Sequence, residues 1–124
     1  MNQAINAEKA PAAVGPYVHA VKAGNMVFTS GQLGIIPETG ELADGVEAQA
    51  EQAIKNIQAV LEEAGYTLQD VVKTTVFLAD MKDFAAINAI YANYFKENKP
   101  ARSCVQAAAL PKGGLFEMEV IAVK

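Results

Sequence analysis

The stretch from Val46 to Ala64 constrains the fold more than any other part of this sequence. Its apolar residues recur at the 3.6-residue period of an amphipathic helix. The stripe consists of Val46, Ala50, Ala53, Ile54, Ile57, Val60, Leu61 and Ala64. Because such a stripe has to be buried, the chain needs a second layer of structure to pack against it.

Both ends of this helix, and its outer face, carry further signals. Asp44 followed by Glu47 predicts an N-terminal capping box, and Gly65 predicts a left-handed helix end. Glu51 precedes Lys55 by four residues, which predicts an exposed ion pair.

A strand and a second helix follow. The segment from Asp70 to Leu78 is rich in valine and threonine and predicts a strand. One face of that strand carries Val72, Thr74, Val76 and Leu78. Asp80 and Asp83 are typical of a helix start, and Pro100 limits where the helix can end. The apolar stripe of this second helix is Phe84, Ile87, Ile90, Tyr91, Tyr94 and Phe95.

The rest of the chain predicts short strands and loops. An extended arm is expected over residues 1–16, and a hairpin turn around Gly24. The further strands expected are residues 17–22, 26–30, 31–37, 103–110 and 115–123. This order predicts a single α+β domain over residues 1–124, a two-layer sandwich with two helices on one face of a mixed β-sheet.

Two helices cannot cover both faces of such a sheet. The second face keeps valine, phenylalanine and methionine side chains, so something else has to bury it. Another copy of the chain is the simplest cover, because most soluble oligomers are symmetric homo-oligomers. An obligate oligomer is therefore predicted.

Charge and cysteine content exclude several classes of protein. The formal net charge is −4 at pH 7 with only ten Lys and Arg residues, which disfavours nucleic-acid binding because phosphate contacts need clustered basic side chains. The single cysteine excludes an internal disulfide and suits a reducing compartment. No run approaches the ~18 apolar residues of a membrane span, and the first residues lack an apolar signal core. A soluble cytoplasmic protein is expected.

Arg102 and two carboxylates near the C-terminus are the main candidates for chemistry. A guanidinium presents a planar donor fork that matches a carboxylate bidentately. Glu117 and Glu119 leave the same strand face, where a partly buried carboxylate can hold a water and accept its proton. Two structural alternatives stay open, namely an ion pair between Arg102 and one of these glutamates, and a solvated sheet edge.

Cys104 shares a strand face with Arg102, but no base stands near it in the sequence. The only histidine, His19, falls in the first hairpin, so a cysteine–histidine nucleophile is not supported and a packed thiol is expected. One histidine and one cysteine also make a metal cluster improbable. Tyr17, Ser30 and Asn88 carry no signal by themselves.

Motifs along nearly the whole chain resemble the Rid family, also called YjgF-like. They are APAAVGPY (residues 10–17), SGQ (30–32), VKTTVF (72–77) and PARSCV (100–105). The resemblance is to the archetypal RidA branch, the reactive intermediate deaminases. It implies a chorismate-mutase-like α+β fold assembled as a homotrimer, with sites in clefts between the subunits.

The resemblance implies an activity: hydrolysis of 2-imino acids, or their enamine tautomers, to 2-keto acids and ammonia. Typical substrates are 2-iminobutanoate and 2-iminopropanoate, released by pyridoxal-phosphate enzymes. By position, Arg102 is expected to bind the substrate carboxylate, Glu117 to activate the attacking water, and the Cys104 backbone to help hold that water. The residues expected to line the cleft are Tyr17, Ser30, Gly31 and Asn88. No metal, no cofactor, no nucleic acid and no membrane is implied.

The sequence departs from the family pattern in two places. Many archetypal members carry charges after the cysteine, where residues 106–109 here are uncharged, and Phe116 replaces an aliphatic residue. Neither change affects Arg102 or Glu117, so the activity is expected to persist. The two changes are expected to affect the preference for the substrate side chain or the stability of the trimer. Two other functions stay open: a non-catalytic keto-acid-binding regulatory protein, and an endoribonuclease or translation inhibitor, as attributed to some relatives.

Overall fold

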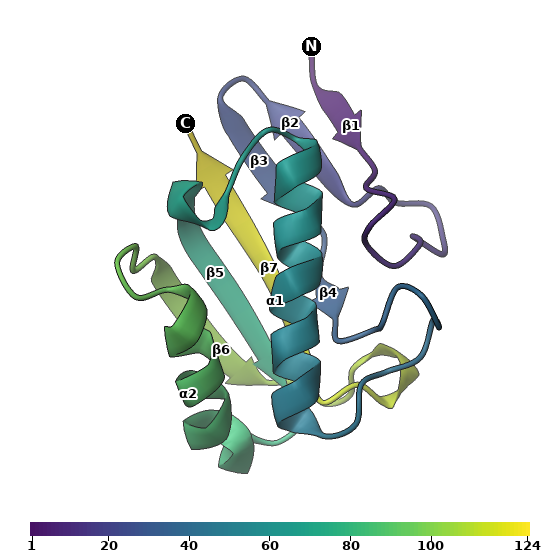
Figure 1. Ribbon diagram of the computed structural model, residues 1–124, viewed down its shortest axis with the longest axis vertical. Coiled ribbons are helices and arrows are strands. Elements are labelled where there is room, and N and C mark those ends of the chain that lie inside the picture. Colours follow the sequence, from purple (N-terminus) through teal and green to yellow (C-terminus); the bar gives the residue numbers. More distant parts are fainter.

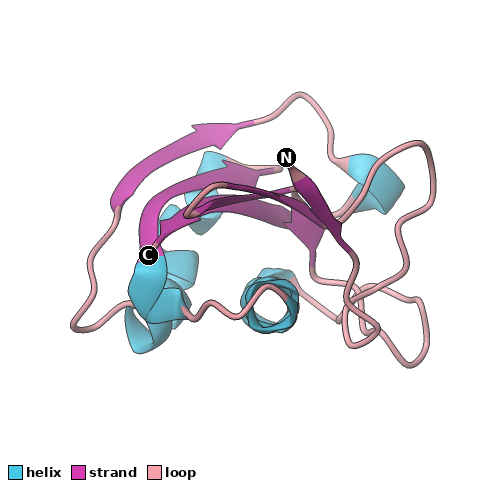
Figure 2. Cartoon of the chain, turned by 90° about the horizontal axis from the view of Figure 1, so that it is seen from above, coloured by secondary structure: helices cyan, strands magenta, loops and turns pink.

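The computed structural model describes residues 1–124 and contains a seven-stranded sheet and two α-helices (Figure 1). The strands are β1 (Gln3–Ile5), β2 (Ala20–Ala23), β3 (Met26–Thr29), β4 (Gln32–Leu33), β5 (Val71–Leu78), β6 (Ala101–Gln106) and β7 (Phe116–Val123). The helices are α1 (Val46–Glu63) and α2 (Phe84–Tyr94), and 3-10 turns span Leu68–Asp70, Met81–Asp83 and Pro111–Gly113. Both α-helices lie on one side of the sheet (Figure 2), which confirms the predicted α+β arrangement.

Strand β7 lies in the middle of the sheet. It pairs antiparallel with β5 along one edge and with both β3 and β4 along the other. The order across the sheet is β1-β2-β3-β7-β5-β6, and β5 and β6 are parallel. Parallel strands need a crossover connection, which α2 supplies here. The sheet is therefore mixed, as predicted, and the start of β6 lies beside α2.

The core fills the space between the sheet and the helices. Ile54 and Leu61 of α1 are fully buried in the same cluster as Phe116 and Met118 of β7. Burying an aliphatic side chain of this size contributes about 1.5–3 kcal/mol to stability. The predicted stripe of the first helix is thus confirmed, and β7 alternates between this core and the opposite face of the sheet.

The prediction for α1 is right at one end and wrong at the other. Gly65, with φ 81°, ends the helix, and the Tyr66 N–H donates to the Leu61 carbonyl at 2.8 Å. That hydrogen bond is the expected pattern for a left-handed cap. At the start, the N-cap is Gly45 and no side chain caps it. The capping box from Asp44 is wrong because the helix begins one residue later than that pairing requires.

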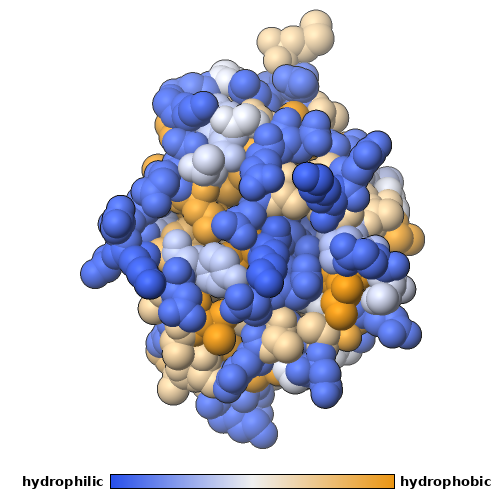
Figure 3. Space-filling view, in the orientation of Figure 1, coloured by the Kyte–Doolittle hydropathy of each residue, from blue (hydrophilic) through white to orange (hydrophobic).

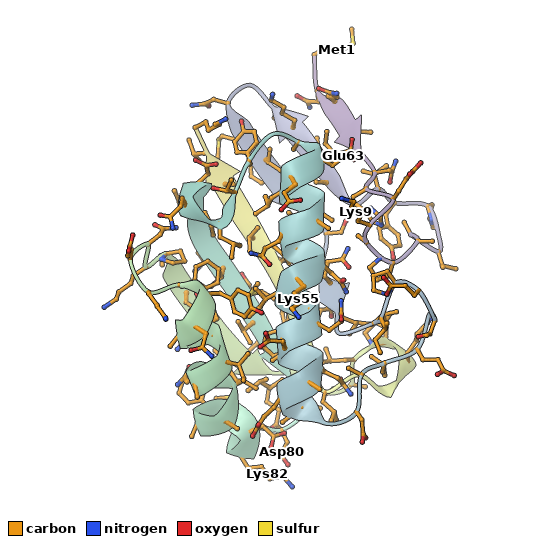
Figure 4. All side chains as sticks on the ribbon, viewed as in Figure 1. Met1, Lys9, Lys55, Glu63, Asp80 and Lys82 are labelled. Carbon is orange, nitrogen blue, oxygen red and sulfur yellow. The ribbon has the colours of Figure 1, made fainter.

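The outer face of α1 also differs from its prediction. Glu51 accepts a hydrogen bond from the Tyr94 hydroxyl of α2 and makes no ion pair with Lys55. Lys55 is exposed on the side of α1 that faces away from the sheet (Figure 4). The predicted pair fails because α2 offers Glu51 a closer partner. The ion pair that does form joins Lys82 and Asp80 at 3.7 Å.

Strand β5 departs from simple alternation, and a further strand forms within the predicted arm. In β5 the register against β7 shifts between Val71 and Lys73, which leaves Val71 buried and Val72 48% exposed. The predicted face is therefore wrong at Val72 and right from Thr74 onward, because a bulge inserts one residue and switches the parity. The predicted extended arm contains β1, which pairs antiparallel with β2.

The sheet face opposite the helices keeps apolar side chains, as expected. Phe28 and Phe77 each follow a buried residue of their strand and point to this side, and Val105 of β6 lies in register with Phe77. Phe28 and Val105 are 41% and 47% exposed. The helix side, in contrast, is largely hydrophilic with scattered apolar patches (Figure 3). Nothing within one chain covers the second face.

Candidate active site

Arg102 lies on the helix side of the sheet, at the start of the edge strand β6. It is in register with Thr74 of β5, and its Nη1 donates a hydrogen bond of 2.7 Å to Oδ1 of Asn88 on α2. The guanidinium also lies 4.7 Å from the ring centre of Tyr91 and 5.4 Å from that of Phe84. A guanidinium stacked on aromatic rings keeps its in-plane donors available. The ion pair with Glu117 or Glu119 that the sequence left open does not form within the chain.

An open pocket of about 400 Å³ adjoins this guanidinium. It is lined by Asn88, Tyr91, Ala92, Phe95, Lys99, Pro100 and Arg102. Because the one side-chain partner of Arg102 is a neutral amide, the positive charge is not neutralised inside the chain. The pocket can therefore accept a small carboxylate.

Tyr91 and Cys104 lie near the guanidinium, and neither side chain neutralises its charge. Burial raises the pKa of Tyr91, against smaller opposing effects of its hydrogen bond to Thr74 and of the Arg102 charge. Burial likewise raises the pKa of the Cys104 thiol, which Arg102 only partly offsets. Both groups are thus neutral near pH 7, and Cys104 packs against the core as a thiol.

Glu117 lies on the opposite side of the sheet. It leaves β7 between the buried residues Phe116 and Met118 and pairs in register with Leu33 of β4. A pocket of about 260 Å³ surrounds it, lined by Pro11, Ala12, Val14, Tyr17, Gly31, Gln32, Leu33, Ile35, Pro111, Lys112 and Glu117. This second pocket combines one carboxylate with mainly apolar walls.

The Glu117 carboxylate rests on the backbone of Gly31. A Cβ atom added at Gly31 would lie only 2.5 Å from Oε2 of Glu117 and 2.9 Å from Cδ. Glycine is therefore needed at this position, because the carboxylate lies against the backbone directly before β4. The neighbouring Ser30 is bound elsewhere, since its Oγ donates to the Val18 carbonyl at 2.7 Å.

The surroundings of Glu117 make it a stronger base than an ordinary glutamate. Desolvation raises its pKa above the usual 4.5, and the negative charge of Glu119 raises it further. A carboxyl group of this kind is suited to accept a proton from water and return it. No group of three or more His, Cys, Asp or Glu side chains is arranged to hold a metal ion.

The predicted site residues thus form two separate half-sites. The arginine half-site contains Arg102 with Asn88, and Cys104 follows on the same strand face. The glutamate half-site contains Glu117 with Tyr17, Gly31 and, beside it in the chain, Ser30. Arg102 and Glu117 do not line one pocket within a single chain, because β6 turns Arg102 toward the helices whereas β7 turns Glu117 away from them. The expected cleft between subunits stays a prediction.

Sequence reasoning missed the aromatic residues that hold the guanidinium. Tyr91 follows Asn88 by three residues on α2, so both project toward the start of β6. Phe84 stands one further turn before Asn88. Their positions in the apolar stripe of the second helix identified them as core residues, and only the packing of α2 against β6 shows that they contact Arg102.

Known proteins similar to this chain agree in fold and over their whole length. A RutC family protein of Haemophilus influenzae is 55% identical, over 100% of this chain and 98% of its own. The 2-iminobutanoate/2-iminopropanoate deaminase of Escherichia coli K12 is 50% identical, over 100% and 99%. The crystal structure of RidA from the Antarctic bacterium Psychrobacter sp. PAMC 21119 superposes with a TM-score of 0.96 at 54% identity, over 98% and 99%.

No helix of the protein combines the length and the apolar composition needed to cross a membrane. The profile of the family described as Endoribonuclease L-PSP matches residues 7–124. With that match and relatives at half identity or more over the full length, the chain belongs to the Endoribonuclease L-PSP family, the YjgF-like family that its motifs resemble.

Proposed function

We propose that the protein is an enzyme that hydrolyses 2-imino acids and their enamine tautomers to 2-keto acids and ammonia. The observation that carries this proposal is the pair of half-sites, an arginine without an anionic partner and a glutamate of raised pKa. A relative at 50% identity is named for this reaction with 2-iminobutanoate and 2-iminopropanoate. The named substrates are small and carry one carboxylate, which suits an arginine.

In the proposed reaction Arg102 binds the substrate carboxylate with two parallel hydrogen bonds. A water molecule held by Glu117 attacks the carbon of the C=N bond while Glu117 takes one of its protons. The electrons of the C=N bond move to nitrogen and give a carbinolamine. The substrate reacts as its iminium form, so return of the proton from Glu117 to nitrogen converts the amine of the carbinolamine into an ammonium leaving group. The C–N bond then breaks, ammonia leaves with the bonding electrons, and the hydroxyl gives its proton to Glu117 as it becomes the keto group. Positioning of the substrate and the water, together with proton transfer, can be enough for catalysis because an iminium carbon is already electrophilic.

We further propose that two copies of the chain build each site. Arg102 and Glu117 lie on opposite sides of one sheet, so one chain cannot present both to a small substrate. A neighbouring copy that covers the second sheet face can bring its own arginine half-site to Glu117. A cyclic homotrimer would repeat this head-to-tail contact three times and bury the apolar face in the same step. Such a trimer of the single domain is the assembly we expect.

The first test is a pair of substitutions, Arg102→Ala and Glu117→Gln. Each should abolish formation of 2-ketobutanoate above background when 2-iminobutanoate is supplied by a threonine dehydratase. The fold should persist, because neither side chain belongs to the core. Full activity of Arg102→Ala would refute the mechanism, and production of keto acid at the same rate with and without the wild-type protein would favour a binding protein.

Mixing the two inactive variants tests the shared site. If subunits are exchanged by unfolding and refolding a 1:1 mixture, a site is intact when one copy supplies Arg102 and its neighbour supplies Glu117. Random mixing in a head-to-tail ring makes about one site in four intact, so about a quarter of the wild-type rate should return. A site contained within one chain predicts no recovery at all.

A further inference from the structure

The single histidine lies under the N-terminal arm with both ring nitrogens engaged. His19 is 3% exposed. Its Nδ1 accepts a hydrogen bond of 2.9 Å from the Ala7 N–H, and its Nε2 lies 2.7 Å from the Pro11 carbonyl oxygen. Since a carbonyl can only accept, Nε2 carries the proton and Nδ1 does not. The two contacts together require the neutral ring in one tautomer.

The arm begins with β1, which pairs with β2, and Asn6 Oδ1 accepts a hydrogen bond of 3.4 Å from the His19 N–H. Beyond Asn6, the contacts with the His19 ring are the polar link between the arm and the rest of the chain. From residue 7 to residue 17, the other hydrogen bonds of the arm are local, from Ala10 N–H to the Ala7 carbonyl and from Tyr17 N–H to the Gly15 carbonyl. The hydrogen bonds that leave this segment go to the ring of His19. Small buried side chains at Ala7 and Ala10 add little contact area. The part of the arm from residue 7 to residue 17 therefore depends on one side chain for its hydrogen bonds to the rest of the chain.

The same residue is joined to the segment between β3 and β4, on which the Glu117 carboxylate rests. The His19 carbonyl accepts a hydrogen bond of 2.9 Å from Ser30 N–H, directly before Gly31, on which the Glu117 carboxylate rests. His19 thus connects the arm to the backbone that supports Glu117.

The arm lines two hollows. It supplies Pro11, Ala12, Val14 and Tyr17 to the pocket around Glu117. It also lines an open hollow of about 440 Å³, formed by Asn6, Ala7, Glu8, Ala10, Ala12, Ala13, Tyr17 and His19. A segment bordered by open space can move away from the pocket that it lines unless hydrogen bonds hold it.

We propose that His19 is a positioning residue whose Nε2-protonated ring holds the arm closed against the Glu117 pocket. It does not touch the substrate. It acts through the arm, which places Tyr17 and the apolar wall formed by Pro11 and Ala12 beside the carboxylate. The effect on substrate rests on the proposed deaminase function, whereas the effect on the arm does not.

Two substitutions separate the hydrogen bonds from the volume of the side chain. His19→Leu fills the space but can neither accept from Ala7 N–H nor donate to the Pro11 carbonyl. His19→Gln keeps one acceptor and one donor in a single amide and is the matched control. The expected result is a KM for 2-iminobutanoate raised about tenfold in His19→Leu with a smaller change in kcat, and a KM close to wild type in His19→Gln.

A second readout is independent of catalysis. Lys9 lies in the arm between the two anchored residues, so trypsin can cut after it only when the arm opens. Cleavage after Lys9, followed by mass spectrometry, should be about tenfold faster in His19→Leu than in wild type and near wild type in His19→Gln. Equal cleavage in all three proteins would overturn the proposal, even if KM changed. Faster cleavage in a protein without deaminase activity would keep the positioning role and remove only the proposed function.

The wild-type protein provides a check that does not depend on how the variants fold. With one histidine in the chain, a long-range ¹H–¹⁵N spectrum reports this ring alone. A ring protonated at Nε2 and not at Nδ1 is expected at neutral pH. The opposite tautomer, or a doubly protonated ring, would overturn the proposal because neither can accept from the Ala7 N–H.

Discussion

The two half-sites hold their charged groups in opposite ways. Arg102 stands between a strand and a helix, with Asn88, Tyr91 and Phe84 all on α2, so regular secondary structure fixes it. Glu117 also leaves a strand, but its pocket is walled by the arm, whose position depends on His19. Binding a carboxylate needs a preorganised fork, which rigid elements supply. In the glutamate half-site, in contrast, the wall of the pocket can change position when the arm moves.

Replacing Glu117 should produce the largest effect. Glu117→Gln removes the proton acceptor, and general base catalysis typically contributes 10²–10⁴-fold, so the rate of keto-acid formation should fall by about that factor. The wild-type rate should also decline on acidification at a pH above that of an ordinary glutamate, because the carboxylate is protonated earlier. A pH–rate profile of wild type checks this.

The same variant shows how much the half-buried charge of Glu117 lowers the free energy of unfolding. Because the pKa of Glu117 is higher in the folded than in the unfolded chain, the folded state holds more protons between those two values. The free energy of unfolding therefore decreases as the pH rises through that window. Glu117→Gln should lose this dependence and be the more stable protein at neutral pH, measured by urea unfolding. A variant less stable than wild type there would contradict the assignment.

Giving Arg102 a charged partner should weaken substrate binding at the arginine half-site. In Asn88→Asp the guanidinium gains a carboxylate at its present hydrogen-bond position, which then competes with the substrate carboxylate. We expect KM to rise about tenfold with the fold unchanged. Asn88→Ala, which removes the hydrogen bond without adding a charge, is the control and should be less impaired. An unchanged KM in Asn88→Asp would indicate that Arg102 does not bind the substrate.

Adding one methyl group at Gly31 tests how accurately Glu117 has to be placed. Gly31→Ala would bring a Cβ within 2.5 Å of Oε2, and because the carboxylate is the free end of a side chain, it moves rather than the backbone. A rate reduced several-fold, by about tenfold at most, with little loss of stability is expected. Comparison of kcat with the thermal midpoint separates the two effects.

The smallest effect should come from the contact between the two helices. Tyr94→Phe removes the hydroxyl that donates to Glu51 and should lower stability by about 1 kcal/mol without changing the rate. Burial, and then the contact with Glu51, raises the pKa of Tyr94 to about 12. Wild type therefore loses this contribution as the pH rises from 10 toward 12, and the variant should show a weaker decline in that range.

Several parts of the fold follow from local patterns. The stripe of α1, its glycine end and the hairpin around Gly24 depend on residues close together in the chain. Apart from the capping box at Asp44, the errors occur where a distant segment intervenes. Glu51 accepts a hydrogen bond from Tyr94 of the other helix and does not pair with Lys55. The pairing of β5 with β7 contains the bulge that places Val72 on the opposite face from the one predicted. Strand β1 was not predicted because it has little pattern of its own and forms by pairing with β2.

Apart from the bulge at Val72, the sequence alone determined which residues share a face within a strand or helix, because backbone geometry repeats every two or 3.6 residues. That is why Cys104 lies with Arg102, and Glu119 with Glu117. The apolar residues Phe116, Met118 and Val120 indicated that the two glutamates point away from the helices, and their burial confirms this. The sequence could not determine on which side of the sheet Arg102 lies, since that depends on how β6 pairs with β5 across a long stretch of chain. Only the tertiary structure placed the arginine and the glutamate of one chain on opposite sides of the sheet.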